Sequence, residues 1–359
     1  MVKTFSFPSV YESTIREYYT SNDPILGFSK IKVDDSDYLV GLQALNEGVS
    51  PHKSLNASPS DREYKLIAHS ALFLASSIGS NGAKNGNSPK FSITTGFPYA
   101  TYQLNKESAI DFFKSDCVIT TYKADENGNQ NPDQKLVPIC NINVLPEIVG
   151  CDYAIRKGDN PSDGNFIIVS LGYGTCECVV STPNGLLNRT LFSTHGISYA
   201  VDIFTQELSK SSFIGLKTGH QMDQIFTKGG MYIDRKHKDF SEEKKKALRL
   251  YFNNVILPSF TKYITDSDFE LCPKMILVGG GAYNQELINL FNEEFGEICS
   301  ISVFPTPERC ASIGYAIFSK HTDTEKSGNE FASTYDAEGC VYIGIDIGNA
   351  NTCVSVLEG

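Results

Sequence analysis

A carboxylate stands just before a glycine turn near the end of the chain, in a pattern that could bind phosphate and a divalent cation. Residues 341–359 read VYIGIDIGNANTCVSVLEG, in which two alternating apolar runs flank a turn of small residues and asparagine. This pattern predicts a β-hairpin, the C-terminal hairpin, whose turn presents backbone N–H groups and the Thr352 hydroxyl to an anion. Asp346 lies on the incoming strand, where it could hold a hydrated Mg²⁺ against phosphate oxygens. An ordinary hairpin with a polar turn is the alternative.

A second stretch in the middle of the chain repeats this pattern. Residues 166–180 read FIIVSLGYGTCECVV, an apolar strand, a glycine turn and an outgoing strand with Cys176, Cys178 and Val180 on one face. We call it the middle hairpin. The phosphate contacts expected from the two turns are Gly348, Asn349, Asn351 and Thr352 in the first, and Gly172, Tyr173, Gly174 and Thr175 in the second.

A third glycine-rich element, MILVGGGAYNQELINLF at 275–291, joins an apolar strand to a helix. Its turn, Gly279, Gly280, Gly281 and Ala282, would let a flat or charged ligand approach the backbone closely. The motif is weak alone. Together, the three elements in an acidic chain resemble the actin-fold ATPases, the superfamily of actin, heat-shock chaperone ATPases and sugar kinases. The resemblance implies a mixed α/β, actin-like (ribonuclease H-like) fold of two domains with a central nucleotide cleft.

Within that superfamily the chain is most similar to the ParM-like bacterial actins of plasmid segregation. The motifs that carry this resemblance span most of the chain: SFPSVY, YLVGLQAL, DREYKLIAHSALF, FSITTGFPYATY, VLPE, the middle hairpin, GGGA, PERCASIGYAIF and IGIDIGNANTC. In that family the first phosphate hairpin opens the protein, whereas here it comes last. The chain therefore resembles a circular permutant, with a polar linker at about 319–340. The implied domain I is 1–148 plus 307–359, and domain II is 149–306.

Glu147 follows Pro146 in VLPE, where a strand is expected to give way to a helix. A carboxylate at such a junction can point into a cleft. The resemblance implies that Glu147 positions the water that attacks ATP. The structural alternative is that Glu147 is an acid in the first turn of a helix, where it stabilises the helix by complementing its dipole.

Ser170 is the main departure from the family pattern, which has Asp at this place, two residues before the first turn glycine. A serine can accept a hydrogen bond from a metal-bound water but brings no charge, so slow hydrolysis is expected. Glu177 is nearby on the outgoing strand, but its spacing from Cys176 and Cys178 aims it away from their face. We therefore do not expect it to replace the missing acid.

The length, hydrophobic content and net charge of the chain exclude some classes of protein. The chain has 359 residues, 41% of them hydrophobic, a net charge of −11 and no long apolar run, which predicts a two-domain, soluble, cytoplasmic protein without a signal peptide or membrane contact. The acidic charge argues against direct binding of nucleic acid. Ten cysteines without regular spacing predict buried, reduced thiols. The cysteines predicted to be buried because they lie in or beside apolar strands and helices are Cys117, Cys176, Cys178, Cys272, Cys310 and Cys353. A metal site at Cys176 and Cys178 is the less favoured alternative.

The resemblance implies an ATPase that uses Mg²⁺ and assembles into filaments, with Glu147 and Asp346 as its catalytic residues. ATP, or GTP instead, would be the nucleotide, and a DNA-binding adaptor protein would connect the filament to plasmid DNA. Two alternatives stay open. One is a small-molecule kinase of the same fold, and the other is a nucleotide-binding scaffold that no longer hydrolyses ATP because of Ser170.

Overall fold

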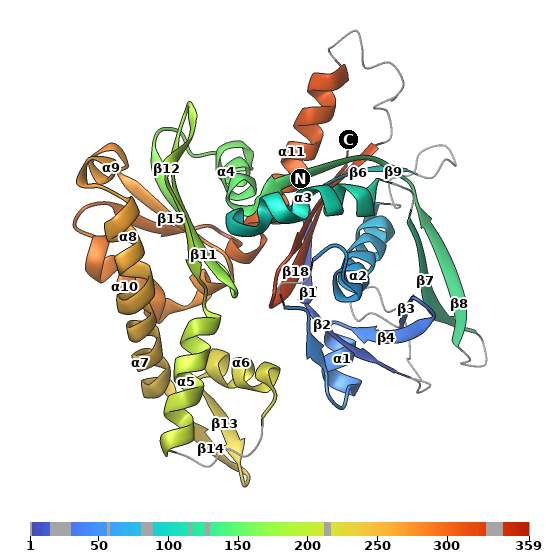
Figure 1. Ribbon diagram of the computed structural model, residues 1–359, viewed down its shortest axis with the longest axis horizontal. Helices are drawn as coiled ribbons and strands as arrows, with labels where there is room; N and C mark the ends of the chain where they lie inside the picture. The colour runs from blue at the N-terminus through green and yellow to red at the C-terminus, as the bar shows by residue number, and fades with distance from the viewer. Residues whose placement is uncertain are drawn as a thin grey trace. The chain divides into compact units, whose positions relative to one another are not determined.

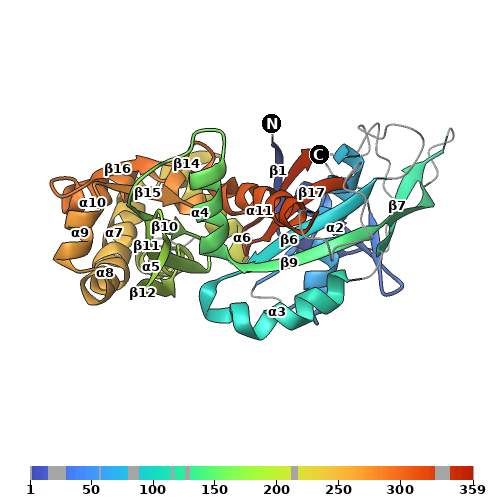
Figure 2. The same cartoon turned by 90° about the horizontal axis from the view of Figure 1, so that it is seen from above.

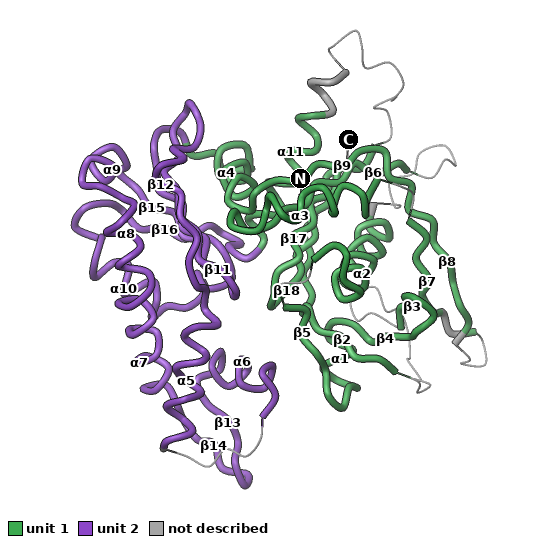
Figure 3. Tube along the Cα trace, viewed as in Figure 1, with its two compact units in different colours: residues 1–162, 309–359 green, residues 163–308 purple. Residues whose placement is uncertain are grey.

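The computed structural model describes residues 2–14, 30–55, 58–79, 89–114, 117–125, 130–211, 217–327 and 340–358. The chain divides into two compact units, Met1–Ser162 with Arg309–Gly359 (unit 1) and Asp163–Glu308 (unit 2), coloured separately in Figure 3. Unit 1 therefore keeps the helix that begins at Glu147, although the sequence placed residues from 149 onward in the second domain. In the described part of the chain, no helix is long and apolar enough to cross a membrane.

Unit 1 contains two sheets, and the C-terminal hairpin lies inside the first of them. This sheet has the order β1-β18-β17-β6-β9. Its strands are β1 (Lys3–Pro8), β6 (Lys90–Phe97), β9 (Ile139–Pro146), β17 (Cys340–Ile347) and β18 (Asn351–Glu358). The chain's first strand pairs with its last, as Figure 1 shows in blue and red. The C-terminal hairpin is thus an interior part of the sheet.

The second sheet of unit 1 has the order β5-β2-β4-β3-β7-β8. Its strands are β2 (Val10–Ser13), β3 (Ile31–Val33), β4 (Ser36–Val40), β5 (His52–Lys53), β7 (Cys117–Ala124) and β8 (Gln130–Val137). Strand β4 ends at Val40, because Gly41 adopts a φ of 66° that turns the chain into α1 (Leu42–Glu47).

Two long helices cover opposite faces of the hairpin's sheet. The helices of unit 1 are α1, α2 (Arg62–Gly79), α3 (Tyr99–Phe113), α4 (Glu147–Lys157) and α11 (Cys310–Ser327), the last preceded by the short η5 (Pro307–Arg309). Ile343 and Ile345 point to α2 in the apolar core, whereas Gly344, between them, lies against the α11 backbone. Figure 2 shows β6 and β9 side by side beneath these elements.

Helix α11 corrects the expected linker at 319–340. Residues 319–327 are helical, and β17 already begins at Cys340, so only 328–339 remain between the two elements, outside the described residues. Polar contacts support the helix where apolar periodicity fails: the Ser319 hydroxyl lies 2.9 Å from the Ser92 hydroxyl, and Asn143 Nδ2 donates to Thr322 Oγ1 at 3.5 Å.

Unit 2 is built around the middle hairpin. Its main sheet has the order β12-β11-β10-β15-β16, and a separate pair is β13-β14. The strands are β10 (Phe166–Leu171), β11 (Thr175–Thr182), β12 (Gly185–His195), β13 (Gly230–Ile233), β14 (Lys236–Asp239), β15 (Lys274–Val278) and β16 (Ser300–Val303). The helices are α5 (Ser198–Ser211), α6 (Gly219–Lys228), α7 (Ser241–Tyr251), η3 (Phe252–Ile256), α8 (Leu257–Tyr263), α9 (Asp266–Leu271), η4 (Gly280–Tyr283) and α10 (Gln285–Phe295).

Candidate functional site

The turn of the C-terminal hairpin is braced from one side by Ser9. Its hydroxyl donates to the Gly348 carbonyl at 2.6 Å and lies 2.8 Å from Thr352 Oγ1, and its N–H donates to the Ala350 carbonyl at 2.9 Å. Thr352 is fully buried. Its hydroxyl therefore braces the turn through Ser9, a role different from the expected contact with an anion.

The same brace orients the amides of this turn. In a trans peptide the carbonyl and the next N–H point in opposite directions, so the Asn349 N–H is directed away from Ser9. Gly348 is required because a Cβ there would lie 2.6 Å from the Asn351 carbonyl oxygen. The Asn349 amide is thus directed to the side of the turn away from Ser9, and its contact with phosphate stays a prediction.

Asp346 and Glu147 come together at one end of this sheet. β6 lies between β17 and β9 and is parallel to both, with Ile345 opposite Thr95 and Pro146 opposite Phe97. Each strand therefore delivers its carboxylate just past the same end of β6. Burial raises the pKa of Asp346 well above its usual range, and the negative charge of Glu147 raises it further. Two half-buried carboxylates this close favour a cation between them.

The same two carboxylates affect the pKa of the Cys151 thiol, which lies one helical turn after Glu147. Its pKa is raised by a hydrogen bond with Cys310, by burial, and by the charges of Glu147 and Asp346. Both carboxylates therefore lie within electrostatic range of this thiol on α4.

Tyr315 is a positioning residue that the sequence did not single out within PERCASIGYAIF. It is fully buried on α11, and its side chain fills the space where Gly96, Gly150 and Gly344 would carry a Cβ. These glycines belong to β6, α4 and β17, the elements that meet at the carboxylate pair. A glycine in each of three segments that converge on one aromatic residue is the signal that a sequence reading could have used.

The turn of the middle hairpin is braced in the same way, by a backbone segment. The N–H groups of Gly196, Ile197 and Ser198 donate to the carbonyls of Gly174, Gly172 and Tyr173 at 3.0, 3.0 and 2.9 Å. The amides of Tyr173 and Gly174 are consequently directed to the opposite side, which forms a concave group of N–H donors suited to an anion.

Side chains and contacts of this turn explain its sequence. A Cβ at Gly172 would lie 2.7 Å from the Thr175 carbonyl oxygen, which is the constraint already seen at Gly348. The Tyr173 hydroxyl donates to Asp223 Oδ1 of α6 at 2.7 Å, so this side chain anchors the turn within unit 2. Thr175 begins β11 opposite His195.

Ser170 lies directly opposite Glu177, which corrects the expectation about the missing acid. In the antiparallel ladder the two residues are register partners, as are Leu171 and Cys176. Register partners point to the same face of a sheet. Glu177 points away from Cys176 and Cys178, as expected, and therefore lies on the same face of the sheet as Ser170. The Glu177 side chain is fully buried there. A carboxylate is therefore present at this level of the ladder, on the outgoing strand.

The third glycine element packs against the end of β10, immediately before the middle hairpin's turn. Cβ atoms at Gly279, whose φ is 81°, and at Gly281 would each collide with Leu171. These two glycines therefore serve packing within unit 2, whereas a Cβ at Gly280 would meet nothing within 4 Å. Ala282 is buried in η4. Unit 2 thus packs the glycines at 279 and 281 against Leu171, the residue just before the turn at 172–175.

Mg²⁺ is the metal that the fold implies, and the residues of unit 1 fit it. Carboxylate oxygens suit this hard cation, and it keeps several of its waters when bound by proteins. Across the described ranges, no group of three His, Cys, Asp or Glu side chains is arranged to hold a metal. Asp346 would be the residue of unit 1 that holds Mg²⁺ by way of its waters.

The other cysteines contribute no metal site to this region. Cys176 and Cys178 are buried in the apolar core of unit 2, in agreement with the favoured sequence interpretation. Cys117 is half-buried, unlike the other five cysteines that the sequence predicted to be buried.

Comparisons with known proteins identify the fold. No family model matches the chain, and no curated protein matches it by sequence. A 15-stranded ParM filament from Clostridium botulinum superposes with a TM-score of 0.67 at 17% identity, covering 88% of this chain and 92% of that one. Ta0583, an archaeal actin homologue in complex with ADP, gives 0.60 at 17% identity over 88% and 92%.

Bacillus thuringiensis ParM with ATP gives a TM-score of 0.55 at 14% identity, covering 90% of this chain and 92% of that one. At these identities the likeness concerns the fold and leaves the activity of this chain open. The chain has the mixed α/β, actin-like fold of the ParM and archaeal actin structures.

Proposed function

We propose that this chain is an ATP-binding, actin-like protein that assembles into filaments and hydrolyses ATP with Mg²⁺. The observation that carries the proposal is the presence of two glycine hairpins of one design. Each has a braced turn with outward-directed amides and a carboxylate at the same level of its ladder. The solved structures with ADP and with ATP support the choice of nucleotide, with GTP as the alternative.

The roles of the residues follow from their chemistry. The turn amides of Asn349, Tyr173 and Gly174 bind phosphate oxygens, and Gly280 admits the base or sugar. Glu147 orients the attacking water and accepts its proton. Bound Mg²⁺ would supply charge neutralisation at the phosphates, and Asp346 is the carboxylate of unit 1 that would hold its waters. Within unit 2, Glu177 is the acid beside Ser170 of the middle hairpin. Slow hydrolysis because of Ser170 stays a prediction, and we propose that Glu177, the register partner of Ser170, supplies the missing charge in part.

Self-association and a role in plasmid DNA segregation belong to the same proposal. The ParM filament from Clostridium botulinum supports assembly of copies of this chain. The net charge of −11 disfavours direct contact with DNA, so a DNA-binding adaptor protein would join the filament to its plasmid. These events would take place in the cytoplasm.

Two measurements separate this function from its rivals. Sedimentation with ATP and Mg²⁺ should pellet the protein, and phosphate should be released at the same time. A kinase of the same fold would stay in the supernatant and release little phosphate without an acceptor. A scaffold would pellet or bind ATP without any release of phosphate.

Glu147→Gln tests the catalytic assignment. The change keeps the size of the side chain and removes its basicity, so we expect kcat to fall by about 100-fold or more while the Kd for ATP stays within about threefold. Single-turnover phosphate release and fluorescent-nucleotide titration measure the two quantities. An equal loss of ATP binding would make Glu147 a structural residue.

We also propose that the chain is a circular permutant of the ParM-like order. Val356 of β18 is the register partner of Lys3 of β1, so the last and first strands are adjacent and a short linker can join them. A variant that begins at Cys340, links Gly359 to Met1 and ends at Ser327 should fold with a Tm within about 5 °C of the original. Failure of this variant to fold would contradict the permuted arrangement.

A further inference from the structure

Two cysteine thiols meet at the opposite end of the sheet from the carboxylate pair. The Sγ atoms of Cys140 and Cys340 lie 3.3 Å apart, although 200 residues separate them in the sequence. Cys340 is the first residue of β17, and Cys140 is the second residue of β9. A disulfide requires about 2.05 Å between the sulfurs, so the thiols are in contact, and bond formation requires that the ends of β9 and β17 approach each other.

An irregularity in the ladder explains how the thiols reach each other across β6. Cys340 is the register partner of Lys90, at the start of β6. On the other side, Phe91 faces Ile139 and Ser92 faces Asn141, so Cys140 is an extra residue in a β-bulge. A bulge changes the direction of a side chain relative to regular alternation. Here it brings Cys140 to the thiol on β17.

Access to solvent distinguishes this pair from the remaining cysteines. Cys140 and Cys117 are the two half-buried cysteines among the ten, and the other eight are buried. Burial raises the pKa of the Cys117 thiol to about 11, which disfavours its reactive thiolate. Cys151 and Cys310 also lie together, with Cys310 Sγ 3.8 Å from the Cys151 carbonyl, but both are fully buried. Cys140 thus combines access to solvent with proximity to a second thiol, that of the buried Cys340.

We propose that Cys140 and Cys340 form a reversible disulfide-forming site. The oxidant is a small disulfide such as glutathione disulfide. The Cys140 thiolate attacks one sulfur of it, giving a mixed disulfide and one glutathione. The Cys340 thiolate then attacks Cys140 Sγ, forming the internal disulfide and releasing the second glutathione. The two thiol protons end on the two glutathiones, and the two electrons lost by the cysteines reduce the oxidant.

The bond would connect the two strands that carry the candidate catalytic carboxylates. Asp346 follows Cys340 by six positions on β17, and Glu147 follows Cys140 by seven across the bulge, so the strands would be tied at one end and bear the carboxylates at the other. The cross-link also closes a loop of 200 residues. Long closed loops restrict the unfolded chain most, so the oxidised protein should have a Tm higher by about 5 °C or more.

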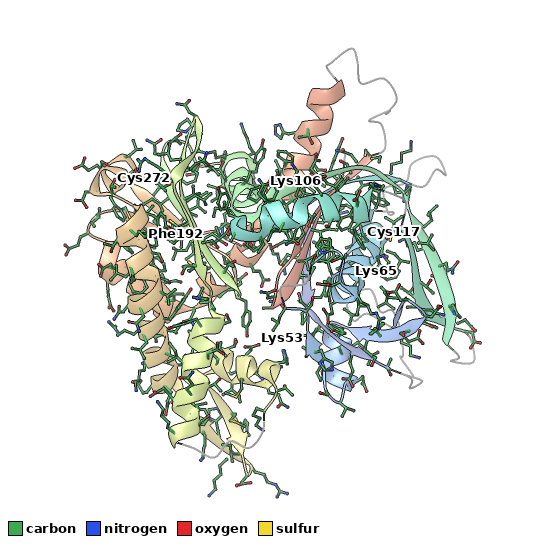
Figure 4. All side chains as sticks on the ribbon, viewed as in Figure 1. Lys53, Lys65, Lys106, Cys117, Phe192 and Cys272 are labelled. Atoms are coloured by element: carbon green, nitrogen blue, oxygen red, sulfur yellow. The ribbon has the colours of Figure 1, made fainter. Side chains whose placement is uncertain are left out.

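Peptide mapping by mass spectrometry tests the site on the full chain, without nucleotide. The protein is equilibrated with reduced and oxidised glutathione at several ratios, trapped with acid and digested. We expect the Cys140–Cys340 peptide pair to be at least about tenfold more occupied than glutathionylated Cys117, because the second step is intramolecular. Cys117→Ser, at the start of β7 (Figure 4), and Cys151→Ser are matched controls that should leave the cross-link unchanged.

Two variants make the result decisive. Cys340→Ser should abolish the cross-link and leave glutathione attached to Cys140, whereas Cys140→Ser should abolish both. Persistent glutathionylation of Cys140 in the unaltered chain, without the cross-linked peptides at any ratio, would overturn the proposal. Because neither measurement involves ATP, failure of the proposed ATPase function would leave this test intact, and the reverse also holds.

Discussion

The C-terminal hairpin and the middle hairpin share a framework but exchange the position of their acid. In each, the first turn position must be glycine because a Cβ there would collide with the carbonyl oxygen three residues later, at Asn351 in one and at Thr175 in the other. In the C-terminal hairpin, Asp346 on the incoming strand faces Cys353. At the equivalent level of the middle hairpin, Ser170 on the incoming strand faces Glu177. The carboxylate is thus on the incoming strand of the C-terminal hairpin and on the outgoing strand of the middle hairpin.

In the proposed site, the ladder position rather than the position in the sequence determines which residue supplies the acid. Cross-strand partners in an antiparallel pair lie about 5 Å apart on one face, so either strand can provide the charge. A motif written along one strand reports an acid as missing when its partner strand supplies it. Each hairpin of this chain has one carboxylate at this level.

The largest effects are expected from removing each carboxylate in turn. Asp346→Asn should lower Mg²⁺-dependent ATP hydrolysis by about 100-fold or more, because Glu147 would lose the second anion that helps it attract the cation. Glu177→Gln should lower it by about tenfold or more. Phosphate release at several Mg²⁺ concentrations measures both. Glu294→Gln, an exposed acid on α10, is the control and should have no effect.

Unchanged hydrolysis in Glu177→Gln would break the comparison, because it would leave the middle hairpin without a functional acid. Unchanged hydrolysis in Asp346→Asn would remove the assignment of the metal to unit 1.

Replacing the first glycine of either turn by alanine should destabilise the protein to the same extent in both hairpins. Gly348→Ala and Gly172→Ala each place a Cβ against a backbone carbonyl oxygen, at 2.6 and 2.7 Å. Both turns must open slightly, which should cost about 1–3 kcal/mol of the free energy of unfolding. Gly219→Ala, where a Cβ meets nothing within 4 Å, is the control in urea denaturation. A clear difference between the two turn variants would show that their frameworks are not equivalent.

The sequence predicted the elements that depend on local pattern. Both hairpins, the strand-to-helix junction at Glu147 and the actin-like fold are found as expected, because alternating apolar residues and glycine turns act over short distances. Glu147 also lies close enough to Asp346 for its charge to raise the pKa of that carboxyl, whereas their joint catalytic role stays a prediction.

Features that depend on contacts across strands were missed. The spacing of Glu177 along β11 predicted which face of the sheet its side chain occupies. It did not predict that Ser170 lies opposite, because this pairing depends on the register between β10 and β11. Ser9 and Thr352 meet although 343 residues separate them. The end of α11 was placed too early, because its last turns are supported by Ser92 and Asn143 rather than by an apolar stripe. The bulge at Cys140 likewise leaves no mark in the local sequence.

The most direct test of the exchange moves the acid back across the ladder. Ser170→Asp combined with Glu177→Gln gives the middle hairpin the arrangement of the C-terminal one, with its acid on the incoming strand. Ser170→Asp alone places two buried acids opposite each other and should destabilise the protein. The measurement is the rate of Mg²⁺-dependent phosphate release, compared among the double variant, Glu177→Gln and the unaltered chain. We expect the double variant to recover at least about tenfold over Glu177→Gln, and a double variant no faster than Glu177→Gln would contradict the account.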